Sequence, residues 1–456
     1  MQNDSKQDKR IYTLSEEKPA KAVIALGVPL IMGMFIMVLY NLVDTYFISL
    51  MGDDYKLAAV NLAYPIMMIS VAVSNMIGAG ASSLIARCLG AGQKGRAEQT
   101  LTAGFVLTVI DSAVIAVTGL AFLPQVVKLL GAKESTFAYT EDYVMILLIG
   151  SLFTMGSYTI SALLRSEGSV RLSIVGMIAG TIANIGLDPL FIFTFGLGVK
   201  GAAAATVIGN GVSLGISLYF YLSGKTMLKP RARFIRLQKE TAGEIFRVGI
   251  PATLETLLTS AAYIINNNLA VAYGELTVTA VGIAQKIMTL GNYIYQGFAS
   301  GTQPIMGYNY GAKNYKRMLS VLRSGVMVVS MTELAVMIAY GTLAPLLIGI
   351  FSKTPEVVET GAKALRAIMC ILPFVGATSM SRMSFQAMGK PKHAFTITLI
   401  RQLILYIPLQ LLLNHIFGFS GMIWAQPMTE VIMMCVSLLL LYKVIRREAA
   451  NGTDSQ

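Results

Sequence analysis

The chain of 456 residues is 55% hydrophobic and only 13% charged, with a mean hydropathy of +0.64. Soluble domains carry about 25% charged residues, so this composition excludes a soluble globular protein. The formal net charge is +12, and its distribution along the chain shows whether it needs an acidic partner such as nucleic acid.

Apolar runs recur along the whole chain, and most exceed the roughly 18 residues that a helix needs to cross a bilayer. About twelve are present, at 22–50, 57–82, 98–123, 141–164, 172–195, 201–223, 243–272, 278–305, 319–350, 360–385, 394–417 and 421–443. The first run is too long for a signal-peptide core, so no cleavable signal is expected. The predicted fold class is all-α integral membrane, with twelve transmembrane helices.

Lysine and arginine gather in alternate loops of this map. One side carries most of them, including the segment GKTMLKPRARFIRLQKE at 224–240, whereas the other side has scattered lysines such as Lys56, Lys133 and Lys353. Basic residues are enriched on the cytoplasmic side of membrane proteins. We therefore expect a multi-pass protein of the cell (plasma) membrane with both termini cytoplasmic, and the basicity needs no nucleic acid.

The chain contains an internal repeat. LAAVNLAYPIM at 57–67 aligns with VTAVGIAQKIM at 278–288, an offset of 221, and the same offset pairs Gly80 with Gly301. Upstream, the GVP at Gly27 matches the GIP at Gly249. Each repeat covers six spans, so both halves cross the membrane in the same direction and are expected to be related by a pseudo-twofold axis along the membrane normal. Such paired lobes are typical of secondary transporters, which alternate between inward-open and outward-open states.

The repeat divides the chain into two lobes joined by a basic connection. The predicted organisation is a polar cytoplasmic N-terminus at 1–20, a first lobe of spans 1 to 6 at 21–223, a basic cytoplasmic linker at 224–242, a second lobe of spans 7 to 12 at 243–445, and a cytoplasmic tail at 446–456.

Several ionisable residues fall inside the predicted spans. The acidic ones are Asp44, Asp111, Asp188, Glu255, Glu333 and Glu430, and the basic ones are chiefly Lys286 and Arg401. Each costs about 2.5–3.5 kcal/mol at mid-membrane, which makes each a candidate for function.

Two of these acids lie at the same predicted depth in the first lobe. At about 1.5 Å per residue, Asp44 and Asp188 each lie roughly 10 Å below the outer end of their span. Asn184 shares a helix face with Asp188, and Thr206 and Tyr143 also fall in the outer half of their spans. We expect a polar cluster here.

Such a cluster suits a proton or a small cation. Burial and a neighbouring carboxylate both raise the pKa of a carboxyl group, which then exchanges protons near neutral pH. Pro189 leaves the Ile185 carbonyl without its helical donor and favours a bend at Asp188. The alternative is a buried, hydrogen-bonded aspartate that only fixes helix packing.

The other candidates are less specific. Glu255 could contact a cationic substrate or a proton, and Lys286 on the next span could simply neutralise it. Arg401 and Glu430 are expected to form a structural pair, while Asp111 and Glu333 stay unassigned. Flexible methionine side chains suit a promiscuous pocket, but the sequence alone does not assign Met67 or Met288 to one.

Signals of an enzyme or a bound metal are missing. The three cysteines and two histidines are scattered without ligand spacing, so neither a disulfide framework nor a structural zinc site is expected. No phosphate-binding loop motif is present, which argues against an ATP-driven pump. We expect no enzyme activity and no cofactor.

The quoted residues resemble a known family. The segments VPLIMGMFIMVLYNLVDTYFIS (28–49), LGAGQKGRA (89–97), NIGLDPLFIFTFGLGVKGAAAAT (184–206) and QPIMGYNYGAKNYKR (303–317) are similar to multidrug and toxic compound extrusion (MATE) transporters. The resemblance extends from about residue 20 to 445, and within the family it is strongest to the MepA-type branch of bacterial multidrug exporters.

The resemblance implies a two-lobe antiporter that expels mostly cationic, lipophilic drugs in exchange for H⁺ or Na⁺, with one chain sufficient for transport. It implies a first-lobe cation site formed by Asp44, Asn184, Asp188, Tyr143 and Thr206, which could also hold Na⁺. It matches Glu255 to a glutamate of sodium-coupled relatives. Their span 10 aspartate has no counterpart in MCILPFVGATSMSRM (369–383), which favours coupling in the first lobe.

A lipid-linked saccharide flippase of the same superfamily shape is the alternative function. It would need several cationic side chains around a central cavity to hold phosphate, and spans 1, 2, 7 and 8 offer only Arg247 and Lys286. A cavity rich in carboxylates favours cationic cargo instead.

Overall fold

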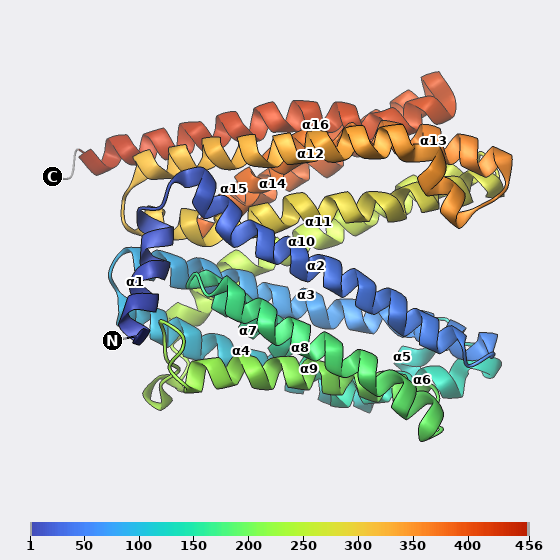
Figure 1. Ribbon diagram of the computed structural model, residues 1–456, viewed down its shortest axis with the longest axis horizontal. Coiled ribbons are helices and arrows are strands. Elements are labelled where there is room, and N and C mark those ends of the chain that lie inside the picture. Colours follow the sequence, from blue (N-terminus) through green and yellow to red (C-terminus); the bar gives the residue numbers. More distant parts are fainter. Residues whose placement is uncertain (1, 454–456) are drawn as a thin grey trace. The chain divides into compact units, whose positions relative to one another are not determined.

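The computed structural model describes residues 2–453, and this part of the chain is helical without any strand (Figure 1). Residue 1 and residues 454–456, the ends of the two predicted terminal segments, lie outside the described residues. In the first half the helices are α1 (Gln2–Ser15), α2 (Pro19–Ser49), α3 (Asp54–Gly90), α4 (Lys94–Ala121), α5 (Leu123–Leu129), α6 (Glu134–Ile149), α7 (Ser151–Ser166), α8 (Val170–Pro189), the π-helix η1 (Leu190–Thr194), α9 (Val199–Leu222) and the 3₁₀-helix η2 (Ala232–Phe234). In the second half they are α10 (Lys239–Val271), α11 (Glu275–Gly311), α12 (Tyr315–Phe351), α13 (Pro355–Met369), α14 (Leu372–Ala387), α15 (Pro391–Leu399), the π-helix η3 (Ile400–Tyr406) and α16 (Ile407–Thr453).

The helices correspond to the predicted spans. Within the described residues, seven helices are long and apolar enough to cross a membrane, or nine if each of two bent helix pairs is one span. One of the seven, Pro391–Ala450, is 60 residues long and breaks at Gly418 into the two predicted spans there. The helices α10 and α11, of 33 and 37 residues, cover the predicted spans 243–272 and 278–305. The all-α membrane fold is therefore confirmed.

Two spans are bent, which the hydropathy pattern did not predict. The pair α6 and α7 bends by 52° and the pair α13 and α14 by 45°, each at a break of a few residues. A lipid-embedded backbone must satisfy its hydrogen bonds within the segment, and a helix tolerates a bend where neighbouring helices cover it. These are spans 4 and 10, which occupy the same place in the two repeats.

The chain forms two compact units whose boundaries cross three helices. The first unit contains the chain up to Ile11 and Met32–Ile250, and the second contains Tyr12–Ile31 and the chain from Pro251 onward. The helices α1, α2 and α10 therefore each contribute residues to both units, and α2 and α10 are the two of these that are predicted membrane spans.

The shared helices are held by backbone contacts at glycine. In the first unit, a Cβ atom on Gly249 of α10 would lie 2.0 Å from the Met76 carbonyl oxygen of α3. In the second unit, a Cβ on Gly301 of α11 would lie 2.7 Å from the Gly27 nitrogen of α2. Small residues let membrane helices approach this closely. The repeated glycines thus make corresponding contacts in the two units.

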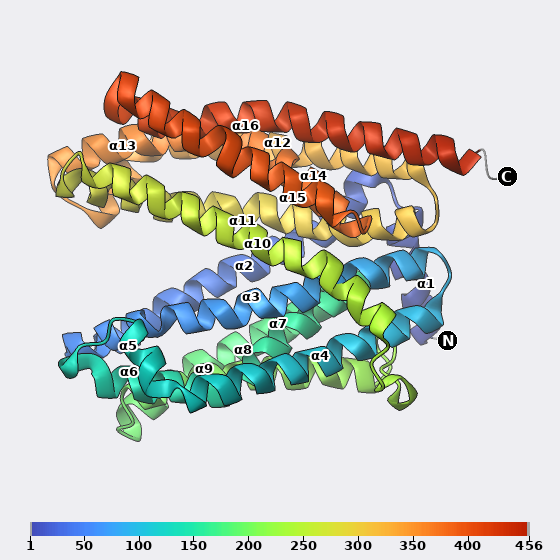
Figure 2. The same ribbon diagram turned by 180° about the vertical axis from the view of Figure 1, so that it is seen from behind.

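A second close approach shapes the first unit from inside. Helix α8 packs along α9 (Figure 1), and a Cβ on Gly180 would lie 2.6 Å from the Gly209 carbonyl oxygen. A Cβ on Gly209 would lie 2.8 Å from the Asn184 Cβ atom. The two glycines bring Asn184 directly against α9. In the second unit, α11 packs against α12, α13 and α14 around a large apolar core (Figure 2).

The linker after α9 is anchored by a buried carboxylate between α7 and α8. Glu167 is 0% exposed and accepts hydrogen bonds from the backbone N–H groups of Met227 (3.1 Å) and Leu228 (2.9 Å) and from the Ser169 hydroxyl (2.9 Å). Burial raises the pKa of Glu167 to about 7, against the opposing effects of these donors and of the nearby Arg10. The Glu167 carboxyl therefore fastens the start of the linker to the first unit.

We predict that Glu167 makes stability depend on pH. Its folded-state pKa lies above the unfolded value of 4.5, so the folded state binds more protons between pH 4.5 and 7 and its stability falls as pH rises through that window. A glutamine accepts the same backbone donors and donates to Ser169. Thermal unfolding in detergent should show the Glu167→Gln variant gaining about 2–3 kcal/mol on the wild type from pH 4.5 to 7.

The exposed Glu240→Gln is the matched control and should follow the wild type at every pH. Glu167→Ala should destabilise at every pH, by about 1–3 kcal/mol, because two buried N–H groups lose their acceptor. Parallel pH profiles of wild type and Glu167→Gln would contradict the assignment.

Candidate functional site

Four helices of the first unit bring the predicted polar residues together. Asp44 comes from α2, Tyr143 from α6, Asn184 and Asp188 from α8, and Thr206 from α9. Asn184, Asp188, Tyr143 and Thr206 are buried, and Asp44 is half-buried. The cluster lies at the level where the glycine contact draws α8 against α9.

The carboxyl groups of the cluster lack hydrogen-bond donors. Asp188 is 0% exposed, and neither of its carboxylate oxygens has a donor among the described residues. The Oδ1 atom of Asp44 and both side-chain polar atoms of Asn184 are likewise buried and unpartnered in this part of the chain. The two carboxyl groups are close enough to interact electrostatically. An unpaired buried charge costs far more than a hydrogen-bonded one, so this arrangement favours uptake of a proton or a cation.

Hydroxyl groups surround the two carboxyls. The Tyr40 hydroxyl lies 3.4 Å from the Thr206 hydroxyl, and the Tyr143 hydroxyl also interacts with Thr206. Both tyrosines interact electrostatically with Asp44 and Asp188. The cluster thus combines two carboxyls, one amide and three hydroxyls, all with oxygen atoms that can accept a proton or ligate a small hard cation.

A cavity of about 80 Å³ opens beside the cluster. Its lining comes from the first unit and includes Tyr40, Asn184 and Thr206 on the polar side and Met37, Met67 and Met177 on the apolar side. Flexible thioethers fill irregular space and tolerate varied ligands. The cavity therefore joins the polar cluster to an adaptable apolar surface, and Met67 is part of it.

Pro189 changes the helix next to Asp188 in a way the sequence only partly predicted. The α-helix runs to Pro189 and continues directly as the π-helix η1, so the local distortion is a change of helical winding. The missing N–H of proline frees the Ile185 carbonyl, and π-helical turns are frequent at functional sites. The π-helix begins at Leu190, two residues after Asp188.

Sequence reasoning missed three residues of this site. Tyr40 lies one turn before Asp44, and Asn210 lies one turn after Thr206, where its amide donates to the Thr206 carbonyl oxygen at 3.0 Å. The Ser157 hydroxyl donates to Asn210 Oδ1 at 3.1 Å. A search for polar residues four positions from each chosen residue would have found Tyr40 and Asn210. No sequence signal indicated Ser157.

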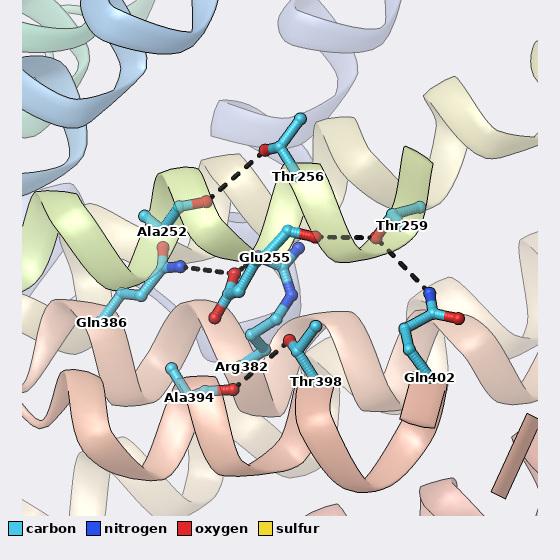
Figure 3. A network of polar contacts seen from close by, with 9 residues as sticks. All are labelled: Ala252, Glu255, Thr256, Thr259, Arg382, Gln386, Ala394, Thr398 and Gln402. Atoms are coloured by element: carbon cyan, nitrogen blue, oxygen red, sulfur yellow. Dashed lines mark hydrogen bonds and ion pairs between the residues drawn. The ribbon is translucent and has the colours of Figure 1, made fainter. Parts of the chain in front are cut away.

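The second unit neutralises Glu255 differently from the prediction. Arg382 Nη1 of α14 donates to Glu255 Oε2 at 2.7 Å, and Gln386 Nε2 donates to the same oxygen at 3.1 Å (Figure 3). The suggestion that Lys286 neutralises Glu255 is therefore wrong, since Lys286 is exposed on α11. Arg382 lies within the stretch 369–383, which carries no acid and this one cation.

The remaining intramembrane charges divide into one pair and two separate acids. Arg401 Nε donates to Glu430 Oε1 at 2.5 Å, which confirms the expected pair. Glu333 is fully buried in α12, and Asp111 is half-buried in α4. Neither belongs to the cluster of the first unit.

Comparisons with known proteins agree along nearly the entire chain. The MatE family model matches residues 29–190 and again 251–412. The multidrug export protein MepA of Staphylococcus aureus (strain MSSA476) is 27% identical over 447 residues, which is 98% of this chain and 99% of that protein.

Solved structures give the same result. A MATE protein in the bent conformation superposes with a TM-score of 0.91 at 27% identity, covering 98% of this chain and 99% of that one. The outward-facing conformation of a multidrug resistance MATE family transporter of the MOP superfamily gives 0.90 at 28% identity, covering 95% and 98%. With two matched repeats, a full-length relative and a common fold, the chain belongs to the multidrug and toxic compound extrusion (MATE) family.

Proposed function

We propose that this protein is a secondary active multidrug efflux antiporter. It exports cationic, lipophilic compounds in exchange for H⁺ (or Na⁺) by alternating access, as a multi-pass protein of the cell membrane with both termini cytoplasmic. The observation that carries the proposal is Asp188, a fully buried carboxyl that has no donor among the described residues, beside Asp44 and a methionine-lined cavity. The names of its relatives, multidrug export protein MepA among them, support the export of drugs.

Coupling follows from the state of the two carboxyls. With both ionised, the cluster holds two uncompensated negative charges in a low-dielectric site and attracts a cationic compound. Uptake of one proton or Na⁺ lowers that negative charge by one and weakens the attraction, which releases the compound. Export and ion entry then alternate at one site, which is the requirement for antiport.

The second unit lacks a matching pair of carboxyls. The two family-model matches begin 222 positions apart, the same offset that relates Gly27 to Gly249, and this offset pairs Asp44 of the first predicted span with Asn266 of the seventh. Gln410 Nε2 donates to Asn266 Oδ1 at 2.6 Å. Amides do not titrate near neutral pH, so this pair keeps a fixed charge and supports coupling in the first unit.

The state of Glu255 supports the same assignment. Its carboxylate already has a permanent cation, the Arg382 guanidinium. A carboxylate held by an arginine cannot exchange that partner for a transported ion without a large cost in free energy. Among the intramembrane acids, we therefore assign coupling to Asp44 and Asp188.

The paired arginines also argue against a lipid-linked saccharide flippase. Arg382 and Arg401, the cations of α14 and η3, are both held by carboxylates. Neither is free to bind a phosphate group. Cationic cargo fits the uncompensated carboxyls better.

Substitution of Asp188 tests its proposed role in coupling. Asp188→Asn should abolish coupled efflux, lowering ethidium export by more than about tenfold, because an amide cannot release or take up the coupling ion. Asp111→Asn, an intramembrane aspartate outside the cluster, is the matched control and should export normally. Efflux is measured in cells and inside-out vesicles with pH and sodium gradients imposed separately. The pH gradient should drive the wild type.

Wild-type export by an expressed Asp188→Asn variant would move the coupling role to Asp44. A response to the sodium gradient alone would assign Na⁺ as the coupling ion, with Asp44, Asn184 and Asp188 supplying oxygen ligands.

Substitution of Arg382 tests the Glu255–Arg382 pair. Arg382→Ala leaves a buried carboxylate without its cation and should lower the free energy of unfolding by about 3 kcal/mol. The double variant Glu255→Gln/Arg382→Gln replaces both charges and should recover most of this loss. Thermal unfolding of the purified protein in detergent measures both. Equal stability of Arg382→Ala and the wild type would contradict the pairing.

A further inference from the structure

A second cavity, of about 220 Å³, lies within the second unit. Helices α10, α11, α13, α14 and α16 and the π-helix η3 all contribute to its lining. Gln285, Asn292, Arg401 and Glu430 are polar lining residues, and Met288 is one of the apolar ones. The cavity contains both charges of the Arg401–Glu430 pair, so the proposed coupling mechanism does not use it.

This cavity occupies the place that the first cavity has in the first repeat. Met67 and Met288 correspond at the offset of 221 found in the sequence, and each lines the cavity of its own unit. Gly198 (φ 56°, ψ −129°) and Gly418 (φ 58°, ψ −143°) share an unusual backbone conformation, which fixes an offset of 220 for the last span of each repeat.

The offset of 220 pairs two further lining positions. Thr206 corresponds to Gln426 and Asn210 to Glu430, and all four residues line their respective cavities. The repeat has therefore preserved the position of the cavity while its side chains changed.

The side chains at the matching helix crossing also differ between the two repeats. The offset of 221 places Arg401 at the position of Gly180, the glycine through which α8 touches α9. In the second unit, a guanidinium and a carboxylate fill this crossing, and Arg401, Gln402 and Tyr406 all come from η3. A π-helix is wider than an α-helix and is often found at functional sites.

Two buried oxygen atoms beside the cavity can still accept a hydrogen bond. Glu430 is 1% exposed, and its Oε2 atom has no donor among the described residues. The Oε1 atom of Gln285 is also buried without a donor in this part of the chain. In contrast, Arg401 Nε donates to Glu430 Oε1, and Gln402 Nε2 donates to the Thr259 hydroxyl (3.4 Å).

The Arg401–Glu430 ion pair leaves one of the two carboxylate oxygens unpaired among the described residues. Arg401 Nε binds the Oε1 edge of Glu430, so the Oε2 edge is the negative end of the pair. A ligand that brings N–H donors, with or without a positive charge, satisfies Glu430 Oε2 and Gln285 Oε1. An anion would meet the carboxylate and find the guanidinium occupied.

We propose that the cavity of the second unit is a ligand subsite for compounds carrying amine, amidine or similar N–H donor groups. Glu430 Oε2 and Gln285 Oε1 accept from the donor, while Arg401 holds the Glu430 side chain in place. An apolar cavity of about 150 Å³ holds benzene, so this one admits an amine-bearing aromatic ring. Because its pair is fixed, the subsite binds without exchanging an ion.

The test compares two cations that differ in N–H groups. Ethidium carries two aromatic amines, and tetraphenylphosphonium carries no donor. Gln285→Met removes an acceptor whose oxygen has no donor in the described chain, and Gln125→Met makes the same change at an exposed position of α5. The double variant Arg401→Gln/Glu430→Gln removes both charges without leaving one unpaired.

Equilibrium binding to purified protein in detergent is the measurement. We expect ethidium to bind about five- to tenfold more weakly to Gln285→Met and at least tenfold more weakly to the double variant. Tetraphenylphosphonium should bind all variants within about twofold of the wild type, and Gln125→Met should match the wild type for both ligands. Unchanged ethidium binding, or an equal loss for both cations, overturns the subsite.

This inference rests on the proposed efflux function, and the two fail in different ways. A wild type that binds neither cation contradicts both. A wild type that binds and exports both cations, with Gln285→Met and the double variant indistinguishable from it, retains the antiporter and removes only the subsite.

Discussion

The first unit is organised around the burial of Asp188, whose carboxyl group has no hydrogen-bond donor in the part of the chain that the structure describes. An ionised carboxyl in such a place is unstable by several kcal/mol, so the site requires either a proton or a cation. Every neighbouring feature is consistent with this need: a second carboxyl at Asp44, hydroxyls on α2, α6 and α9, and a methionine-lined cavity at the same level. The proposed coupling between an ion and a cationic compound depends on these two carboxyl groups.

Close backbone contacts make that burial possible. Gly180 and Gly209 allow α8 and α9 to touch, so that Asn184 meets α9 and water is excluded from the carboxyl beside it. Glycines at the start of α2 and α10 make the same kind of contact in each unit. Helix α2 also carries Tyr40 and Asp44. The start of this helix belongs to the second unit, and the part with these two residues belongs to the first unit.

The two repeats use one scaffold for different chemistry. Where the first has Asp44, the second has the amide of Asn266, which accepts a hydrogen bond from Gln410. Where the first has Gly180 at a tight helix crossing, the second has Arg401 paired with Glu430 and a larger cavity. Substitution at matching positions thus yields one unit that can change its charge and one whose charge is fixed. Such a division suits a transporter in which one half couples to an ion and both halves contact cargo.

The sequence by itself determined the membrane class, the spans, the repeat and the choice of Asp44 and Asp188, because hydropathy, loop charge and the cost of intramembrane acids are local properties. It also placed Asn184 on the same helix face as Asp188, since helical periodicity relates residues within one span, and it placed Thr206 in the outer half of its own span. Only the tertiary structure showed that Arg382, and not Lys286, neutralises Glu255, and that Ser157 reaches Asn210. Those partners lie on different helices, and the side that each helix turns toward its neighbours depends on packing among helices that are apolar on nearly every face.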